Sequence, residues 1–195
     1  MDDSPTEKPV SVAAFCIDRT EVTTAAYSAC VRNGKCSSAR SVEDRCNAGV
    51  AGRENHPINC VNWDQATAYC KAQGKRLPTA KEWEYAARGN DGREYPWGDE
   101  EPTNQLCWDR DGEGKPNSTC AVGSYPAGRS PFGLDDMAGN VWEWTATERL
   151  LYYVSRGGGW YDVVPLRFRA ISSFGYVPTH RGIDLGFRCA SSPLP

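Results

Sequence analysis

The sequence is poor in histidine and methionine, and it has neither a strong charge nor a long apolar run. Its 195 residues include two histidines and two methionines, and the formal net charge is −3. Such a weak negative charge argues against a nucleic-acid-binding domain, which needs a basic surface. No apolar stretch approaches the ~20 residues that span a bilayer, so we expect no membrane insertion. A chain of this length can bury a sizeable core as one domain.

Cysteine is abundant, but its spacing argues against a zinc site. The nine cysteines form no Cys-x-x-Cys pair, and the two histidines are His56 and His180. Disulfides made in an oxidising compartment explain the cysteines better than scattered buried thiols do. They predict a secreted, periplasmic or cell-surface protein. Because Asp2 and Asp3 follow Met1 directly, we expect any export signal to lie outside this sequence.

The positions of the cysteines also predict part of their pairing. The count is odd, and Cys16 is our candidate for the unpaired thiol. Cys107 and Cys120 flank one polar loop and are expected to pair. Four further cysteines are expected to pair among themselves, in combinations that the sequence leaves open: Cys30, Cys36, Cys46 and Cys60.

Three helices are predicted from capping signals and helical spacing. One runs from Thr23 to Val31 and one from Trp63 to Gln73, where Gly74 ends it. The third begins at a capping box formed by Thr79 and Glu82 and ends at Gly89.

Strands and loops are predicted for most of the rest. Residues 1–9 are expected to be disordered, and residues 10–195 to form a single domain. Residues 90–131 are expected to be a long loop, which needs a disulfide or a cation to order it. Strands are expected at residues 11–18, 58–61, 141–145, 152–155, 167–171 and 186–189.

Residues 133–144 carry the most chemical information. They read Gly133-Leu134-Asp135-Asp136-Met137-Ala138-Gly139-Asn140-Val141-Trp142-Glu143-Trp144. Asp136 and Glu143 are hard oxygen ligands, and Gly139 and Asn140 permit a turn that points carbonyls inward. Calcium takes about six to eight such oxygens. A simple turn before a Trp-rich strand explains the same residues equally well.

The same stretch resembles a signature of the formylglycine-generating-enzyme (sulfatase-modifying-factor) family. Residues 74–89 match a second signature of that family, Gly-Lys-Arg-Leu-Pro-Thr-x-x-Glu-Trp-Glu-Tyr-Ala-Ala-Arg-Gly. Further matching blocks are Ile17-Asp18-x-x-Glu21-Val22-Thr23, Tyr95-Pro96-Trp97-Gly98, Arg156-Gly157-Gly158 and Leu185-Gly186-Phe187-Arg188-Cys189. The blocks follow the family's order and cover nearly the whole chain.

The resemblance implies an α+β fold of the C-type-lectin-like type. Such a fold is loop-rich, with a small twisted antiparallel sheet and two main helices, and binds calcium. The resemblance implies side-chain ligands at Asp136 and Glu143 and carbonyl ligands at Gly139 and Val141. It implies a second possible calcium site beginning at Asn104 and Gln105, with Asp109 or Asp111 as substitute ligands. It also implies a disulfide between Cys70 and Cys189.

The resemblance fails at the family's reactive centre. The two catalytic cysteines of the family would fall at Asp162 and near Pro165, and a serine before them at Gly159. In the family those thiols bind copper and engage the substrate cysteine, and Cu(I) prefers such soft ligands. We therefore expect no copper and no formylglycine-generating activity.

Recognition is the function that remains for this region. Residues 160–184 mix aromatic, aliphatic and basic side chains, as binding hot spots do. We expect a monomeric, exported, calcium-stabilised domain that binds a protein or a small ligand there, while Phe168, Ile171 and Phe187 fill the core. The candidate contact residues are Trp160, Tyr161, Asp162, Val163, Arg167, Arg169, Phe174, Tyr176 and His180.

One alternative is a divergent metal-dependent oxidase or tailoring enzyme of the same superfamily. In that case Asp162, His180 and Asp184 could supply a base or a carboxylate ligand. A lone histidine in a loop is more often structural, so we rank this alternative below recognition.

Overall fold

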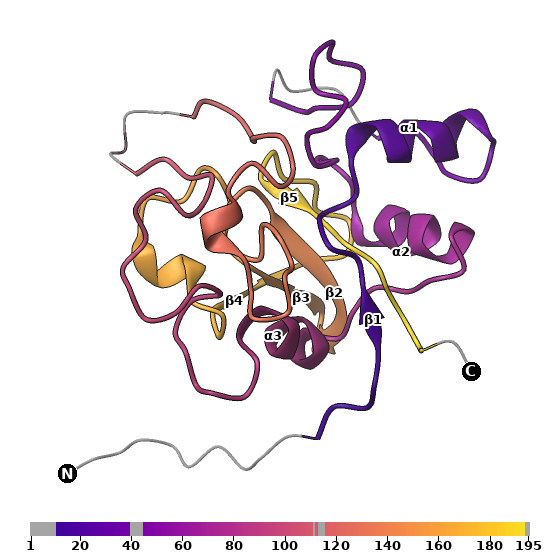
Figure 1. Cartoon of the computed structure of the whole chain (residues 1–195). Coiled ribbons are helices and arrows are strands. Elements are labelled where there is room, and N and C mark those ends of the chain that lie inside the picture. Colours follow the sequence, from indigo (N-terminus) through magenta and orange to yellow (C-terminus); the bar gives the residue numbers. More distant parts are fainter. Residues whose placement is uncertain (1–10, 40–44, 111, 113–115, 194–195) are drawn as a thin grey trace.

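The computed structural model describes residues 11–39, 45–110, 112 and 116–193, in which short elements alternate with long loops (Figure 1). The helices are α1 (Thr24–Arg32), α2 (Trp63–Ala72) and α3 (Ala80–Arg88), with 3-10 turns η1 (Pro126–Gly128) and η2 (Pro165–Phe168). The strands are β1 (Cys16–Ile17), β2 (Trp142–Arg149), β3 (Tyr152–Arg156), β4 (Ser173–Tyr176), β5 (Leu185–Gly186) and β6 (Ala190–Ser191). This mixture confirms the α+β class. The predicted disorder of residues 1–9 lies outside the described residues.

Side-chain caps fix where the three helices begin. The Thr23 hydroxyl caps α1, and Asn62 caps α2 in a capping box with Gln65. The predicted capping box of α3 is confirmed, because Thr79 and Glu82 each accept a hydrogen bond from the other's backbone N–H. The helices span 9, 10 and 9 residues, so there are three of similar length rather than two main ones. None of the described helices is long and apolar enough to cross a membrane.

The main sheet has the strand order β4-β3-β2-β5. β3 pairs antiparallel with both β2 and β4, whereas β5 runs parallel to β2. The expected sheet was antiparallel throughout. The difference arises because residues 177–184 carry the chain from β4 at one edge of the sheet to β5 at the other edge, beside β2, and a parallel neighbour requires such a crossover. β1 and β6 form a separate antiparallel pair.

Two predicted strands are wrong and two others are shorter than predicted. Residues 167–171 overlap η2, because Pro165 fixes the backbone angle that begins a 3-10 turn, and the strand starts only at Ser173. Residues 58–61 are not a strand, since Cys60 has a φ of 58°. The predicted strand at 11–18 shrinks to β1, and that at 186–189 overlaps β5 at Gly186 alone, since β6 begins after it at Ala190.

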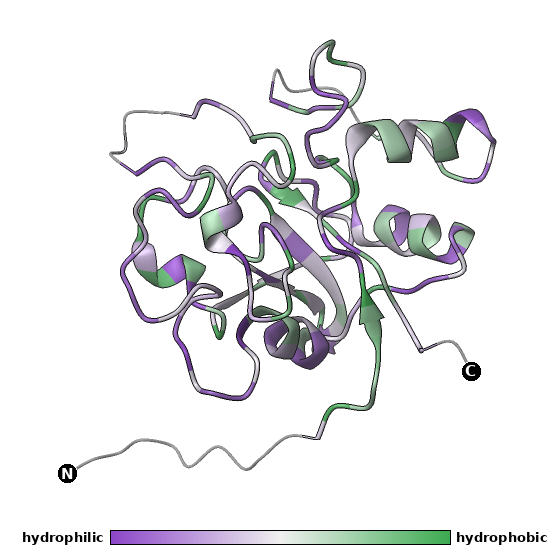
Figure 2. Ribbon diagram, viewed as in Figure 1, coloured by the Kyte–Doolittle hydropathy of each residue, from purple (hydrophilic) through white to green (hydrophobic). Residues whose placement is uncertain are grey.

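The core consists of three buried clusters. The first lies between α1, α2 and the main sheet and includes Tyr27, Trp144 and Phe187. The second lies under α3 around Trp83 and Met137. The third anchors the long loop of residues 90–131. Its buried members are Tyr95, Leu106, Trp108, Ala138 and Phe168. In Figure 2 the ribbon of β1 is green, hence hydrophobic, and that of α3 is mixed but largely purple, hence hydrophilic.

Four disulfides hold the loops to this core. They are Cys30–Cys36, Cys46–Cys60, Cys70–Cys189 and Cys107–Cys120. The free cysteine among the described residues is Cys16, which is exposed. These pairs confirm the predicted disulfides and resolve the pairing that the sequence left open.

Candidate functional site

A fully buried ion pair lies at the centre of the molecule. Arg188, between β5 and β6, donates from Nη2 to Glu143 Oε1 at 2.7 Å and from Nε to Oε2 at 2.8 Å. Trp83 Nε1 of α3 also donates to Glu143 Oε2, at 2.8 Å. Both oxygens of the predicted calcium ligand Glu143 therefore already accept hydrogen bonds, although each carboxylate oxygen keeps a further lone-pair direction.

Two more buried carboxylates neighbour this pair. Glu21 is 2% exposed, and within the described part of the chain neither of its carboxylate oxygens has a hydrogen-bond partner. Burial, together with the neighbouring Asp136 carboxylate, raises the pKa of Glu21 well above its ordinary value. Asp136 accepts a hydrogen bond from Gly123 N–H at 2.6 Å, and burial raises its pKa as well.

The charges of this buried cluster fit a divalent cation. Three carboxylates (Glu21, Asp136 and Glu143) face one guanidinium, and an unpaired buried charge is costly. Gly139 and Val141, the predicted carbonyl ligands, lie on the turn between Asp136 and Glu143. However, no three His, Cys, Asp or Glu side chains in the described part of the chain converge closely enough to hold a metal. A calcium ion here would need main-chain oxygens as well.

Glu21 lies in one of the blocks that match the family, but no role was predicted for it. Its place in that block was the available signal. An acidic side chain is seldom fully buried without a charged partner, so its burial here is informative. Its burial becomes visible only when Asp136, Glu143 and Arg188 are brought together around it in the fold.

The described residues of the predicted second calcium site lie in different surroundings. Asn104 is exposed, and the side-chain oxygen of Gln105 accepts a hydrogen bond from Thr103 N–H at 2.7 Å. The Gln105 carbonyl is packed against Gly128, where an added Cβ would lie 2.0 Å from that oxygen. Asp109 is buried, and Asp111 lies outside the described residues.

The positions of the family's catalytic residues form a tight turn. Asp162 Oδ2 accepts hydrogen bonds from Gly159 N–H at 2.9 Å and from Trp142 Nε1 at 2.8 Å. A Cβ at Gly159 would lie 2.8 Å from the Asp184 Cβ, so a serine does not fit there without a shift. Asp184 is therefore close to this turn, and burial, with Asp162 as a neighbour, raises its pKa to about 6.

The C-terminal face, by which we mean the exposed side chains of residues 160–184, holds most of the predicted contact residues. Tyr161, Val163, Arg167 and Phe174 are exposed. His180 is exposed and stacks on Tyr176 with ring centroids 4.5 Å apart. The structure adds further apolar side chains that were not among the contact residues: Val164, Leu166, Ile171 and Val177.

Three predicted placements on this segment need correction. Trp160 is fully buried, because its Nε1 donates to the Ile183 carbonyl and its ring fills the space beneath Tyr161. Arg169 is partly buried and forms an ion pair with Glu94 at 3.0 Å. Ile171 is 53% exposed rather than in the core, because it follows η2 on a turn.

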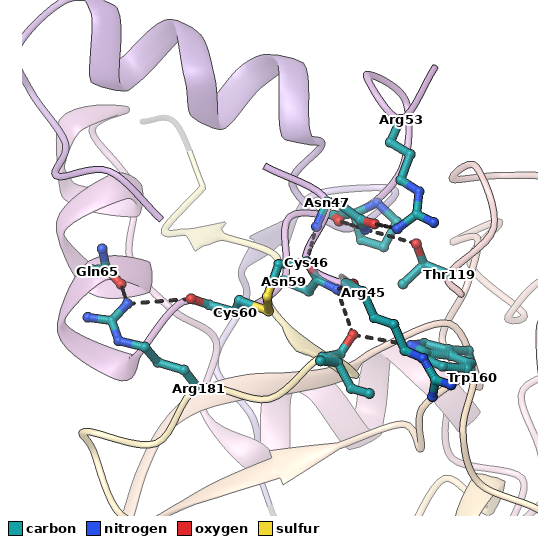
Figure 3. Close-up of a disulfide and its surroundings, with 12 residues drawn as sticks. Arg45, Cys46, Asn47, Arg53, Asn59, Cys60, Gln65, Thr119, Trp160 and Arg181 are labelled. Atoms are coloured by element: carbon teal, nitrogen blue, oxygen red, sulfur yellow. Dashed lines mark hydrogen bonds between the residues drawn. A yellow bond between two sulfur atoms is a disulfide. The ribbon is translucent and has the colours of Figure 1, made fainter. Parts of the chain in front are cut away.

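A disulfide-anchored arginine borders the C-terminal face (Figure 3). The Arg45 guanidinium lies 5.5 Å from the Trp160 ring centroid and 5.7 Å from that of Tyr161. The neighbouring Cys46–Cys60 bridge fixes this segment, and Asn59 Nδ2 donates to the Arg45 carbonyl at 2.9 Å. Arg45 was not among the predicted contact residues, because its position depends on the pairing of Cys46, which the sequence leaves open.

The chain is similar to several known proteins. Residues 2–193 match the family model described as "Sulfatase-modifying factor enzyme 1-like domain". The chain is 37% identical over 161 residues to the inactive C-alpha-formylglycine-generating enzyme 2 of Bos taurus, covering 74% of this chain and 53% of that protein. It is 34% identical over 166 residues to the hercynine oxygenase of Mycolicibacterium thermoresistibile, covering 71% and 36%. It thus spans about half the length, or less, of these relatives.

A solved structure shares the fold. PvdO from Pseudomonas aeruginosa superimposes with a TM-score of 0.77 at 24% identity, covering 97% of this chain and 86% of that one. The fold is therefore the C-type-lectin-like type that the resemblance implied.

Proposed function

The chain belongs to the sulfatase-modifying factor enzyme 1-like family, and from that premise we propose that it is an exported, non-catalytic member that recognises a ligand. The observation that carries this proposal is the Asp162 turn. Where the family places a thiol, a carboxylate accepts hydrogen bonds from Gly159 and Trp142. Eight cysteines form disulfides, and the exposed Cys16 lies on β1, outside this turn.

The C-terminal face supplies the recognition surface in this proposal. Its apolar members are 41–55% exposed and lie among Arg167, His180 and Arg45. Aromatic and arginine side chains on a rigid frame lose little conformational entropy when they bind. Of the relatives, one is named an inactive formylglycine-generating enzyme, in keeping with a family member that does no chemistry. The ligand is a protein or a small molecule.

Affinity capture from the extracytoplasmic fraction of the source cells tests the surface. A variant with Tyr161→Ser, Val163→Ser and Phe174→Ser should lose the ligand that the wild type retains. Val50→Ser, which alters a comparably exposed residue elsewhere, should retain it. Equal capture by the wild type and the triple variant contradicts the proposal.

We also propose that the buried carboxylate cluster binds calcium. Glu21, Asp136 and Glu143 would hold the ion with the carbonyls of Gly139 and Val141, and its charge would offset their mutual repulsion. Calcium should raise the melting temperature of the wild type above its value in a chelator. Glu21→Gln should reduce that difference, whereas Glu54→Gln, an exposed change, should not. A melting temperature that is the same in calcium and in chelator would contradict a calcium site.

A second candidate function is metal-dependent oxidation. Asp162 and Asp184 are neighbours at the family's reactive position, and one relative is named a hercynine oxygenase. The metal content of the purified protein discriminates between the candidates. Stoichiometric copper or iron that is lost in Asp162→Asn would favour oxidation over recognition.

A further inference from the structure

The tip of the β2–β3 hairpin presents two adjacent leucines to solvent. Arg149 pairs with Tyr152 across the ladder, so Leu150 and Leu151 alone form the turn. Their side chains are 91% and 78% exposed, more than any other large hydrophobic side chain that the structure describes. Tyr152 beside them is 47% exposed. Single exposed apolar residues are ordinary, whereas an apolar pair at the summit of a hairpin points to a contact.

The backbone of this turn does not suit leucine. Leu150 has a φ of 58°, and Leu151 does not share the positive angle. A positive angle at the first of two central residues is typical of a type II′ turn, which favours glycine at that position. A side chain there brings its Cβ close to the following carbonyl oxygen. The leucine is therefore present at a cost to the turn, and such outliers concentrate at functional sites.

The size and composition of the tip suit a lipid surface better than a protein. Three side chains fall well short of the roughly 800 Å² that each partner of a standard protein interface supplies. A bilayer, in contrast, accepts a few apolar side chains on a projecting segment, aided by attraction to anionic headgroups. Arg149 is exposed and can reach lipid phosphates, and the amphipathic Tyr152 suits the headgroup level.

The tip itself, residues 149–152, carries one charged side chain, that of Arg149, and the charges around its base are mixed. Lys81 is exposed at the start of α3, which is joined to the end of β2 by a hydrogen bond from Ala80 N–H to Thr147 Oγ1 at 2.9 Å. Glu148 is the acidic residue next to Arg149 in β2. Asp64 of α2 also lies near the hairpin, where it and Glu148 both act on Tyr153, so the attraction to anionic headgroups depends on Arg149 at the tip itself.

We propose that the tip, residues 149–152, is a peripheral membrane contact that inserts Leu150 and Leu151 into an anionic phospholipid surface. Such a contact needs no long apolar run, which is why the composition of the chain gives no sign of it. It is independent of ligand binding at the C-terminal face.

Vesicle flotation with the full chain tests this contact. The wild type should bind vesicles of equal parts phosphatidylcholine and phosphatidylglycerol, and bind phosphatidylcholine alone more weakly. Leu150→Gly with Leu151→Asn removes both apolar side chains and gives the turn its preferred glycine. This double variant should bind at least about tenfold more weakly, with a melting temperature equal to or above that of the wild type.

Two matched variants separate the contributions. Leu166→Asn removes an exposed leucine from the C-terminal face and should bind vesicles as the wild type does. Arg149→Gln should weaken binding to the anionic vesicles, as added salt should. The proposal is overturned if the wild type floats with neither vesicle, or if the double variant binds as well as the wild type. It is equally overturned if sedimentation shows self-association that the double variant abolishes, because the tip then contacts a second copy.

Discussion

Asp184 and Asp162 meet beneath the C-terminal face, and one of them is held in an unfavourable charge state at neutral pH. Burial and the Asp162 carboxylate raise the pKa of Asp184 to about 6, against about 3.9 in an unfolded chain. Between these values the folded state binds more protons than the unfolded state. The contribution of Asp184 to stability therefore falls as the pH rises from about 4 to 6.

Asp184→Asn should remove this loss because the amide is neutral at every pH. We expect the variant to be about 1–3 kcal/mol more stable than the wild type at pH 7, and to differ much less at pH 4. Urea unfolding of both proteins at the two pH values measures the difference. Asp64→Asn, on the exposed first turn of α2, serves as the control. Equal stability of the variant and the wild type at pH 7 would show that Asp184 is not destabilised by burial.

At the residue scale, the sequence identifies which side chains can act as ligands, but not which groups surround them in the fold. Asp136 and Glu143 were recognisable as oxygen ligands from their motif. That Glu143 is bonded to Arg188, and that Glu21 is buried beside Asp136, depends on contacts between segments at least 45 positions apart. Trp160 shows the same limit. Its residue type and its place in the 160–184 segment suggested a contact residue, whereas its surroundings bury it.

At the scale of elements, α3 depends most directly on a local sequence signal. Its capping box satisfies two backbone N–H groups, and Arg76 donates to the same Glu82 carboxylate at 2.7 Å. The helix presents Trp83 to Glu143, so its start is connected to the buried ion pair.

Thr79→Ala should destabilise the protein by about 1 kcal/mol, the usual loss for an N-cap. Thr79→Ser keeps the capping hydroxyl and should stay close to the wild type. Guanidinium unfolding of the three proteins measures both changes. If the alanine and serine variants lose equal stability, the packing of the threonine methyl matters rather than the cap.

Elements with local signals were predictable, and those without were not. All three helices could be located because capping residues and helical spacing lie within the element itself. Strands such as β5 are only two residues long and exist through pairing with β2, a partner more than 40 positions away. Segment 167–171 has a strand-like composition, but Pro165 two residues earlier starts a 3-10 turn instead.

At the scale of the whole molecule, disulfides compensate for the small amount of regular structure. The Cys70–Cys189 bridge joins α2 to the chain just before β6, across a separation of 119 residues. Closing a loop of about 100 residues restricts the unfolded chain by about 4.7 kcal/mol in the chain-entropy account. The Cys107–Cys120 bridge lies inside the long loop, where few hydrogen-bonded elements are available to order it.

This arrangement predicts how many thiols the protein exposes. With eight cysteines in disulfides and Cys16 exposed on β1, the folded protein should react with one equivalent of a thiol reagent. Unfolding without reductant should release no more, because the bridges are covalent, and Cys16→Ser should abolish the reaction. The measurement is thiol titration of protein purified from an oxidising compartment. Several reactive thiols in the unfolded protein would mean that the bridges are not formed there, and the case for export, which depends on them, would fail as well.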